Sequence, residues 1–367
     1  MKWLFFFIVL LHAVIHTFGF LKAFRFAEFN QLTQQIAKSA GVLWLVCFLF
    51  LLLSAILFVS NNDYWWMAAS AGVILSQILI IMFWHDAKFG TLPNILILLV
   101  AVVGFSEWDF NCEVKNEIIE MFARNKIEKT EVLTKDKISH LPSTVQQWLR
   151  NSGVIGKEII QTVRLKQMGS MKLKPEQKDW YTAYAEQFFT ISKPAFVWKT
   201  KVDMIPLVYF NGRDFFADGK GKMLIKILSL FNIVNAHDEK INQGTMQRFL
   251  AEIVWFPTAA VNSYINWENL DSSSAKATLN YKGSEVTGIF YFNDEGDFEK
   301  FSTMRYMGSG EEAVLKEWTI TVKENEIING IKIPTKLEVS WKLDSGIFTW
   351  FVLKVCAIEY NKQELWN

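Results

Sequence analysis

Residues 42–59 read VLWLVCFLFLLLSAILFV, a stretch of eighteen residues without a charge. A helix needs about 20 mostly apolar residues to cross the hydrocarbon core of a bilayer. Three further apolar runs lie around this one, at about residues 3–20, 65–84 and 89–108. The pattern therefore predicts four transmembrane helices in an N-terminal region that covers residues 1–106.

The first apolar run also resembles the start of a secretory signal peptide, because Lys2 precedes a dense apolar stretch. No small-x-small cleavage site follows, since His12, His16 and bulky phenylalanines occupy that part of the run. We expect a retained helix, with cleavage as the alternative.

Lysine and arginine in the short loops predict the orientation of these helices. The first loop carries Lys22, Arg25 and Lys38, the second carries none, and the third carries Lys88. The first and third loops therefore face the cytoplasm, although Lys2 at the other end of the first helix favours the opposite orientation. This orientation places everything after the fourth helix outside the cytoplasm, so we expect an inner or plasma membrane protein with an extracytoplasmic C-terminal domain.

The composition changes near residue 107. Residues 1–105 hold only five basic and three acidic side chains, whereas charge is dense after that point. Apolar residues at helical spacing in residues 107–140 predict an amphipathic linker. Residues 141–367 form the third region, an extracytoplasmic β-rich domain, because apolar and polar side chains alternate along most of it.

Short runs of alternating residues predict many strands in this third region. Turn signals separate the runs at Asn211-Gly212, Asp218-Gly219, Lys282-Gly283, Asn293 to Asp297, Asn329-Gly330 and Asp344-Ser345-Gly346. Most spacers are too short to hold the helix that parallel strands need, so the sheet is mainly antiparallel. A short helix is predicted at residues 143–150, and two longer ones at residues 175–189 and 245–256. The predicted fold is α+β: four transmembrane helices, then a large curved half-barrel sheet with helices on its concave side.

The composition excludes several function classes. Lys and Arg number 38 and Asp and Glu 37, so the net charge is +1 and no basic excess favours nucleic acid. Three cysteines exclude a disulfide scaffold and a four-cysteine zinc site. Cys112 and Cys356 could pair outside the membrane, but nothing in their spacing requires it.

Histidines raise the question of a metal. His12 and His16 are four residues apart on the first predicted helix, and His85 ends the third. In the orientation above the three could converge on a metal or haem. We favour the alternative, polar groups tolerated near helix ends, and expect no metal and no cofactor.

One acidic residue, Glu252, lies in the apolar end of the predicted helix at residues 245–256. Burying it alone is costly, so it needs a partner. Either Glu252 and Arg248 line a cavity and orient a ligand headgroup, or Glu252 simply pairs with Arg248 or with a strand arginine such as Arg213 or Arg305. The sequence leaves both interpretations open.

Residues 180–267 are rich in aromatic side chains, some of which we expect to line an apolar groove. A pocket with apolar walls and a few charged groups suits an amphipathic ligand. A solid aromatic core without a cavity is the alternative. The candidate ligand-binding residues are Trp198, Arg213, Phe215, Arg248, Phe249, Glu252 and Trp255, with Arg248 and Arg213 as headgroup contacts.

Several motifs resemble an uncharacterised family of bacterial proteins over about residues 140–361. They are Leu141-Pro142-Ser143 with residues 146–150, Val163 to Gln167 with Gly169 and Met171, Pro194 to Trp198, Asn211 to Asp214, Gly219 to Met223, Gln243 to Arg248, Leu250 to Pro257, Gly330 to Pro334 and Trp341 to Leu343. This resemblance implies a domain of unknown function in the bacterial envelope and no catalytic residue. The order of elements is also similar to Lol-type lipoprotein carriers, half-barrels that hold acyl chains.

Three functions follow as hypotheses. We favour a membrane-tethered, non-catalytic binding domain for a lipid or other amphipathic molecule. The first alternative is a module that binds another envelope protein. The second is a hydrolase or isomerase acting on a membrane substrate through Glu252 or Asp214, although no G-x-S-x-G or H-E-x-x-H motif is present.

Overall fold

The computed structural model describes residues 2–125, 127 and 131–366. The chain divides into two compact units. The first, called the helical unit below, comprises Met1–Cys112 and Leu228–Leu230. The second, called the sheet unit, comprises Glu113–Ile227 and Phe231–Asn367.

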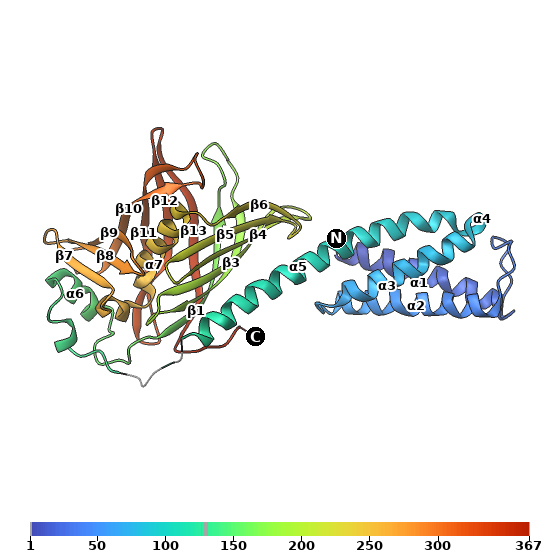
Figure 1. The fold of residues 1–367 in the computed structure, drawn as a ribbon, viewed down its shortest axis with the longest axis horizontal. Helices are drawn as coiled ribbons and strands as arrows, with labels where there is room; N and C mark the ends of the chain where they lie inside the picture. The colour runs from blue at the N-terminus through green and yellow to red at the C-terminus, as the bar shows by residue number, and fades with distance from the viewer. Residues whose placement is uncertain (1, 126, 128–130, 367) are drawn as a thin grey trace. The chain divides into compact units, whose positions relative to one another are not determined.

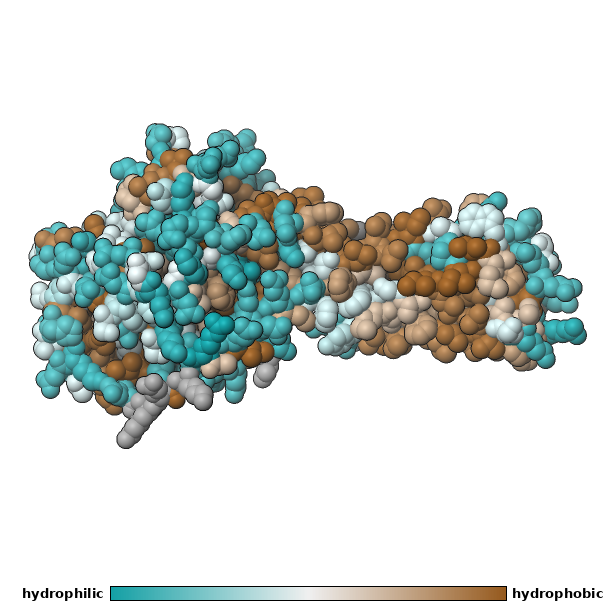
Figure 2. All heavy atoms as spheres, viewed as in Figure 1, coloured by the Kyte–Doolittle hydropathy of each residue, from teal (hydrophilic) through white to brown (hydrophobic). Residues whose placement is uncertain are grey.

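The helical unit holds helices long and apolar enough to cross a membrane, four of them among the described residues. They are α1 (Lys2–Ala23), α2 (Lys38–Val59), α3 (Trp65–Met82) and α5 (Thr91–Ala123), the last preceded by α4 (Trp84–Ala87) and the 3-10 turn η1 (Lys88–Gly90). Apolar side chains cover much of the surface of this unit (Figure 2). The four predicted apolar runs are thus confirmed as helices.

Helix α5 continues beyond the predicted end of the fourth apolar run near residue 108 and ends at Ala123. No glycine or proline interrupts residues 108–123, so nothing in the sequence breaks the helix where the charge density rises. Val114, Ile118 and Met121 are buried along one side of this last part. The first part of the predicted linker is therefore the end of the same helix.

The described residues of the sheet unit form one sheet of thirteen antiparallel strands (Figure 1). The strands are β1 (Thr162–Met171), β2 (Tyr181–Thr190), β3 (Ala195–Ile205), β4 (Val208–Ala217), β5 (Lys220–Ile227), β6 (Phe231–Ala236), β7 (Ile265–Asn269), β8 (Ser274–Tyr281), β9 (Ser284–Phe292), β10 (Phe298–Met307), β11 (Val314–Ile328), β12 (Ile331–Leu343) and β13 (Gly346–Tyr360). The chain enters at β1 in the middle, moves out to β6 at one edge, restarts at β7 on the other edge and returns to β13 beside β1. The α+β fold with a large antiparallel sheet is confirmed.

Helix α7 (Glu239–Glu252) connects the two edges of this sheet. Because β6 and β7 lie at opposite edges, the connecting segment must cross a face of the curled sheet, and α7 contacts β4, β5 and β8 to β10 (Figure 1). Its N-terminus is capped by Asp238, which accepts a hydrogen bond from the Ile241 N–H at 2.9 Å. We call the face of the sheet that carries α7 the inner face, and the opposite one the outer face.

Aromatic rings fill the space between the inner face and the segment that follows α7. Phe189, Phe196, Phe216, Phe249 and Phe256 are fully buried, and neighbouring ring centroids lie 4.9–6.3 Å apart. The 3-10 turns η3 (Ile253–Trp255) and η4 (Pro257–Val261) close this core. The helix α6 (Ser143–Asn151), predicted from Pro142 and Gly153, packs Trp148 near the rings of Trp267 and Phe290.

The predicted helix at residues 175–189 is wrong, because Tyr181–Thr190 is strand β2, paired along its length with β1 and β3. Its inner face carries the small residues Ala183 and Ala185, while Tyr184 is exposed on the outer face. Because the inner face carries small residues and both faces carry aromatic ones, the alternation of apolar and polar side chains typical of a strand is not visible in this sequence. The aromatic residues instead have a spacing typical of a helix.

The predicted turn at Asn211-Gly212 is also wrong, since both residues lie inside β4. A Cβ atom at position 212 would come within 3.0 Å of Cγ2 of Thr200 on the neighbouring strand. Glycine at position 212 lets the side chain of Thr200 lie close to the backbone of β4, and it does not form a turn. The reversal lies earlier, at Leu207, which has a φ of 72°.

Candidate functional site

A cavity of about 420 Å³ lies between α7 and the inner face of the sheet. Sites for small molecules usually measure about 300–1,000 Å³ and are mostly apolar. Strands from both halves of the sheet contribute to its walls, which are rich in aromatic rings. Six of these side chains are Trp198, Trp255, Trp318, Trp341, Trp350 and Phe351.

A buried ion-pair cluster forms part of the wall. Arg248 of α7 donates from Nε to Oε1 of Glu252 at 2.8 Å and from Nη1 to Oδ2 of Asp214 at 2.6 Å. Gln187 Nε2 donates to the other oxygen of Glu252 at 2.8 Å. The guanidinium of Arg248 also lies 4.5 Å from the ring centroid of Trp198. The cluster thus satisfies both oxygens of Glu252 and two nitrogens of Arg248.

The electrostatics of this cluster follow from its burial. Burial raises the pKa of Glu252 above its ordinary value, and Arg248 opposes that rise by favouring the carboxylate. Burial by itself would lower the pKa of Arg248, but Glu252 and Asp214 together raise it above its ordinary value. Arg248 therefore stays charged, and the carboxylates act as its counterions.

A second arginine, Arg305 of β10, lines the same cavity. Its guanidinium lies 4.6 Å from the ring centroid of Trp318 and 6.0 Å from that of Trp341. The described residues give it no ion pair, and its Nε has no hydrogen-bond partner among them. Burial and the nearby charge of Arg248 lower the pKa of Arg305 to about 10, so it is still a cation at neutral pH.

The sequence offers Arg305 only as an alternative partner for Glu252, but in the structure Glu252 binds Arg248 and Gln187 instead. A signal for Arg305 did exist. Phe301 and Thr303 precede it at intervals of two on the same strand, and both are buried. Strand alternation therefore places Arg305 on the same inner face as Phe301.

Four predicted site residues meet at the cavity wall: Trp198, Arg248, Glu252 and Trp255. Both indoles are held in place by hydrogen bonds. Trp198 Nε1 donates to Oε1 of Gln167 and Trp255 Nε1 donates to the Pro334 carbonyl, each at 3.0 Å. These residues come from β3 and from the α7–η3 segment, which the tertiary fold brings together.

The other three predicted residues lie elsewhere. Phe249 is fully buried in the aromatic core, between the rings of Phe216 and Phe256. Arg213 and Phe215 alternate with Asp214 along β4, so they face outward when Asp214 faces the cavity. Sequence spacing alone did not show which of these neighbours points inward.

On the outer face, Arg213 forms ion pairs with α5. Its Nε lies 3.1 Å from Oε2 of Glu117, and its Nη2 lies 3.6 Å from Oε1 of Glu113. The ring of Phe215 is covered by Lys222, whose Nζ is 5.5 Å from the ring centroid. Arg213 is thus a buried strand residue with two carboxylate partners, and not a headgroup contact in the cavity.

The histidines of the helical unit belong to a polar network. His16 Nε2 lies 2.9 Å from Oγ of Ser76, and His12 Nε2 lies 2.8 Å from Oδ1 of Asn94. His85 is exposed beside Asp86. Within residues 2–125, 127 and 131–366, no group of three or more His, Cys, Asp or Glu side chains is arranged to hold a metal ion. Cys112 and Cys356 are both free thiols.

A family model described as a family of unknown function, DUF6544, matches residues 131–353, and the chain belongs to this family. This match confirms the resemblance drawn from the sequence motifs. A comparison with curated proteins gave no match. Among solved structures, a LolA superfamily protein from Nitrosomonas europaea aligns with a TM-score of 0.31 and 10% identity, over 60% of this chain and 95% of that chain.

Proposed function

We propose that this member of the DUF6544 family binds an amphipathic molecule, such as a lipid, in the cavity between α7 and the sheet. The observation that carries the proposal is the cavity itself, about 420 Å³ in volume and walled mainly by aromatic and aliphatic side chains. Transfer of an apolar chain from water to such walls is favourable by about 25 cal/mol per Å² of buried surface. The binding needs no catalysis.

The helical unit supports a tether in this proposal. Its four helices are long and apolar enough to cross a membrane, and we propose that they hold the sheet unit outside the cytoplasm of a bacterial cell. A binding domain on a tether meets ligands of the same membrane at a raised effective concentration. Capture of a lipid from that membrane fits this arrangement better than capture of a dilute soluble molecule.

A role in acid–base catalysis has less support. Both oxygens of Glu252 accept hydrogen bonds from Arg248 and Gln187, and Asp214 is bound to Arg248 as well. A general base must lie within hydrogen-bond reach of the substrate proton, and the hydrogen bonds of these two carboxylates are made to Arg248 and Gln187. The cluster is built to neutralise Arg248, which favours binding over hydrolysis or isomerisation.

Photocrosslinking tests the proposal on the full chain reconstituted in lipid nanodiscs. The probe is a phosphatidylcholine with a diazirine in one acyl chain, and labelled peptides are located by mass spectrometry. We expect label in peptides of β12 and β13, whose residues Leu337, Val339 and Leu353 line the cavity. Label confined to the helices of the helical unit would overturn the proposal.

A matched pair of variants sharpens this experiment. Val339→Trp fills the cavity from the inner face of β12 and should reduce labelling of the sheet unit at least fivefold. Lys342→Trp adds the same ring at an exposed position of the same strand and should change nothing. If Val339→Trp does not fold, as judged by its thermal transition, Ile320→Trp on β11 fills the same space.

A further inference from the structure

The charged side chains around the cavity do not balance. Four cations line it, Lys172, Lys240, Arg248 and Arg305, against two carboxylates, Asp214 and Glu252. The formal charge of the wall is therefore +2 when both carboxylates are ionised. Such a surplus in a site with apolar walls favours a ligand that brings negative charge.

The two carboxylates are already used by one of these cations. Both lie within 2.8 Å of Arg248, on atoms Nε and Nη1. No ion pair links either carboxylate to Arg305, although burial already disfavours its charge. The Nε atom of Arg305 is buried without a hydrogen-bond partner, which is costly for a charged group, so an anion in the cavity would stabilise this side chain.

The surroundings of Arg305 keep its side chain in one place. The rings of Trp318 and Trp341 flank the guanidinium. Gln247 of α7 donates to Oγ1 of Thr303 at 3.0 Å and to the Met304 carbonyl at 2.8 Å, which fixes the neighbouring backbone of β10 to the helix. Gly244 leaves the space that Arg305 occupies, because a Cβ atom there would lie 3.1 Å from Nε.

The polar atoms of the cavity wall that lack a hydrogen-bond partner are all of one kind. Among the described residues that line the cavity, the buried side-chain nitrogens and oxygens without a hydrogen-bond partner are Nε of Arg305, Nε1 of Trp318 and Nε1 of Trp350. All three are N–H donors. A ligand that satisfies them supplies acceptor oxygens, as carboxylate and phosphate groups do.

We propose that Arg305 binds the anionic headgroup of an amphiphile whose apolar chain lies along the aromatic wall of the cavity, an inference that rests on the proposed function. The headgroup is a carboxylate or a phosphate. Arg305 thereby selects acidic over neutral amphiphiles. Arg248, whose charge is balanced by the ion pairs with Glu252 and Asp214, shapes the wall and does not make this contact.

The test uses the full chain in a non-ionic amphipathic polymer and two fluorescent probes, an anthroyloxy-labelled stearic acid and its methyl ester. The probes share one chain and differ by one charge. We expect the wild-type chain to bind the acid at least tenfold more tightly than the ester. Arg305→Gln should weaken binding of the acid at least tenfold and leave binding of the ester unchanged.

Two further variants control for charge and position. Lys300→Gln removes a cation from the outer face of the same strand, because Lys300 directly precedes the inward-facing Phe301. This change should leave the affinities for both probes unchanged. Arg305→Lys keeps the charge and should keep the preference for the acid at reduced size. Competition for the acid by lysophosphatidic acid at lower concentration than by free palmitate would assign the preferred headgroup to phosphate, and the reverse order to carboxylate.

The outcomes separate the two proposals. If the wild-type chain binds neither probe, and no displacer, the proposed function fails. If it binds acid and ester equally, or if Arg305→Gln changes neither affinity, the assignment of Arg305 is overturned while the cavity remains a binding site. Thermal unfolding of Arg305→Gln close to that of the wild-type chain ensures that the loss is one of binding, since Arg305 has no ion pair within the described part of the chain.

Discussion

The outer and inner faces of the same sheet differ in the partners that they give to an arginine. On the outer face, Arg213 lies between two glutamates of α5, Glu113 and Glu117. On the inner face, Arg305 is surrounded by aromatic rings and has no ion pair among the described residues. Both side chains carry the same charge, so the difference lies in what the fold places opposite them.

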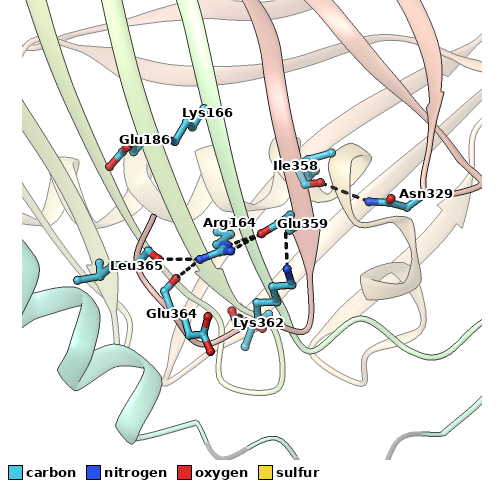
Figure 3. A network of polar contacts seen from close by, with 10 residues as sticks. Arg164, Lys166, Glu186, Asn329, Ile358, Glu359, Lys362, Glu364 and Leu365 are labelled. Carbon is cyan, nitrogen blue, oxygen red and sulfur yellow. Dashed lines mark hydrogen bonds and ion pairs between the residues drawn. The ribbon is translucent and has the colours of Figure 1, made fainter. Parts of the chain in front are cut away.

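Arg164 of β1 extends the outer-face pattern (Figure 3). Its Nε donates to Oε2 of Glu359 at 2.6 Å, and its Nη1 donates to the carbonyls of Glu364 and Leu365 at 3.0 and 2.7 Å. The ring centroid of Trp366 lies 4.3 Å from the guanidinium. This arginine holds the C-terminal segment to the sheet and has little capacity for another partner.

The comparison shows that burial of a charged residue does not by itself mark a binding site. Arg164, Arg213 and Arg248 are all buried or nearly so, and each has carboxylate partners from the chain. Arg305 differs because none of the residues that the structure describes forms an ion pair with it. An arginine with its partners in place stabilises the fold, whereas one without them is available to a ligand.

The largest effect is expected at Arg248. Arg248→Ala leaves Asp214 and Glu252 buried without a counterion, so the free energy of unfolding should fall by about 3–5 kcal/mol. Chemical denaturation followed by tryptophan fluorescence measures this loss. The triple variant Arg248→Met, Asp214→Leu, Glu252→Leu should recover most of it, because apolar side chains replace the whole cluster. A loss below 1 kcal/mol in Arg248→Ala would show that the cluster is hydrated.

A smaller effect is expected at Arg213. Arg213→Met should lower the free energy of unfolding by about 1–3 kcal/mol, because Glu117 is largely buried and Glu113 is half exposed to water. Binding of the fluorescent acid should be unchanged. This pattern is the reverse of that expected for Arg305→Gln. A weakened affinity for the acid in Arg213→Met would break the distinction between the two faces.

The smallest effect concerns pH and the C-terminal segment. Lys362 and Arg164 lower the pKa of Glu359 below its ordinary value of about 4.3. A lowered pKa in the folded state means that the contact is fully present above the ordinary value and is lost as the pH falls through the lowered one. We expect the Trp366 signal in ¹⁹F NMR of fluorotryptophan-labelled protein to shift only in this acidic range.

Glu359→Gln provides the control for this titration. The amide cannot ionise, so the Trp366 signal should lose its pH dependence and resemble the acidic form at every pH. The signal is assigned by its absence in Trp366→Phe. A wild-type signal that moves at neutral pH would mean that another group controls the segment.

Much of the architecture was accessible from local patterns. Eighteen uncharged residues in a row at residues 42–59 can only be buried in a bilayer or in other apolar helices, so the helix followed directly. Turns such as Lys282-Gly283 and Asn329-Gly330 carry positive φ angles at both positions, which is a strong local signal. Strand β2 was missed because its inner face carries the small residues Ala183 and Ala185 and its aromatic residues lie on both faces.

The candidate site was accessible only in part. The costly position of Glu252 on an apolar helix pointed to Arg248, which lies one turn away and does pair with it. Arg213 and Asp214 are adjacent in sequence but face opposite sides of the sheet, so their separate roles needed the register of β4. Arg305 lies 57 residues beyond Arg248, and only the path of α7 across the sheet brings them to one cavity.

The sequence by itself determined the apolar helices and most of the antiparallel strands, and it offered Arg248, one helical turn away, as one of the partners of Glu252, because each of these depends on residues close together in the chain. The tertiary structure decided which face each arginine occupies and which carboxylates remain for it. Ion pairing depends on distances of a few ångströms between elements far apart in the chain. The missing counterion of Arg305 is therefore a property of the fold and of no single stretch of sequence.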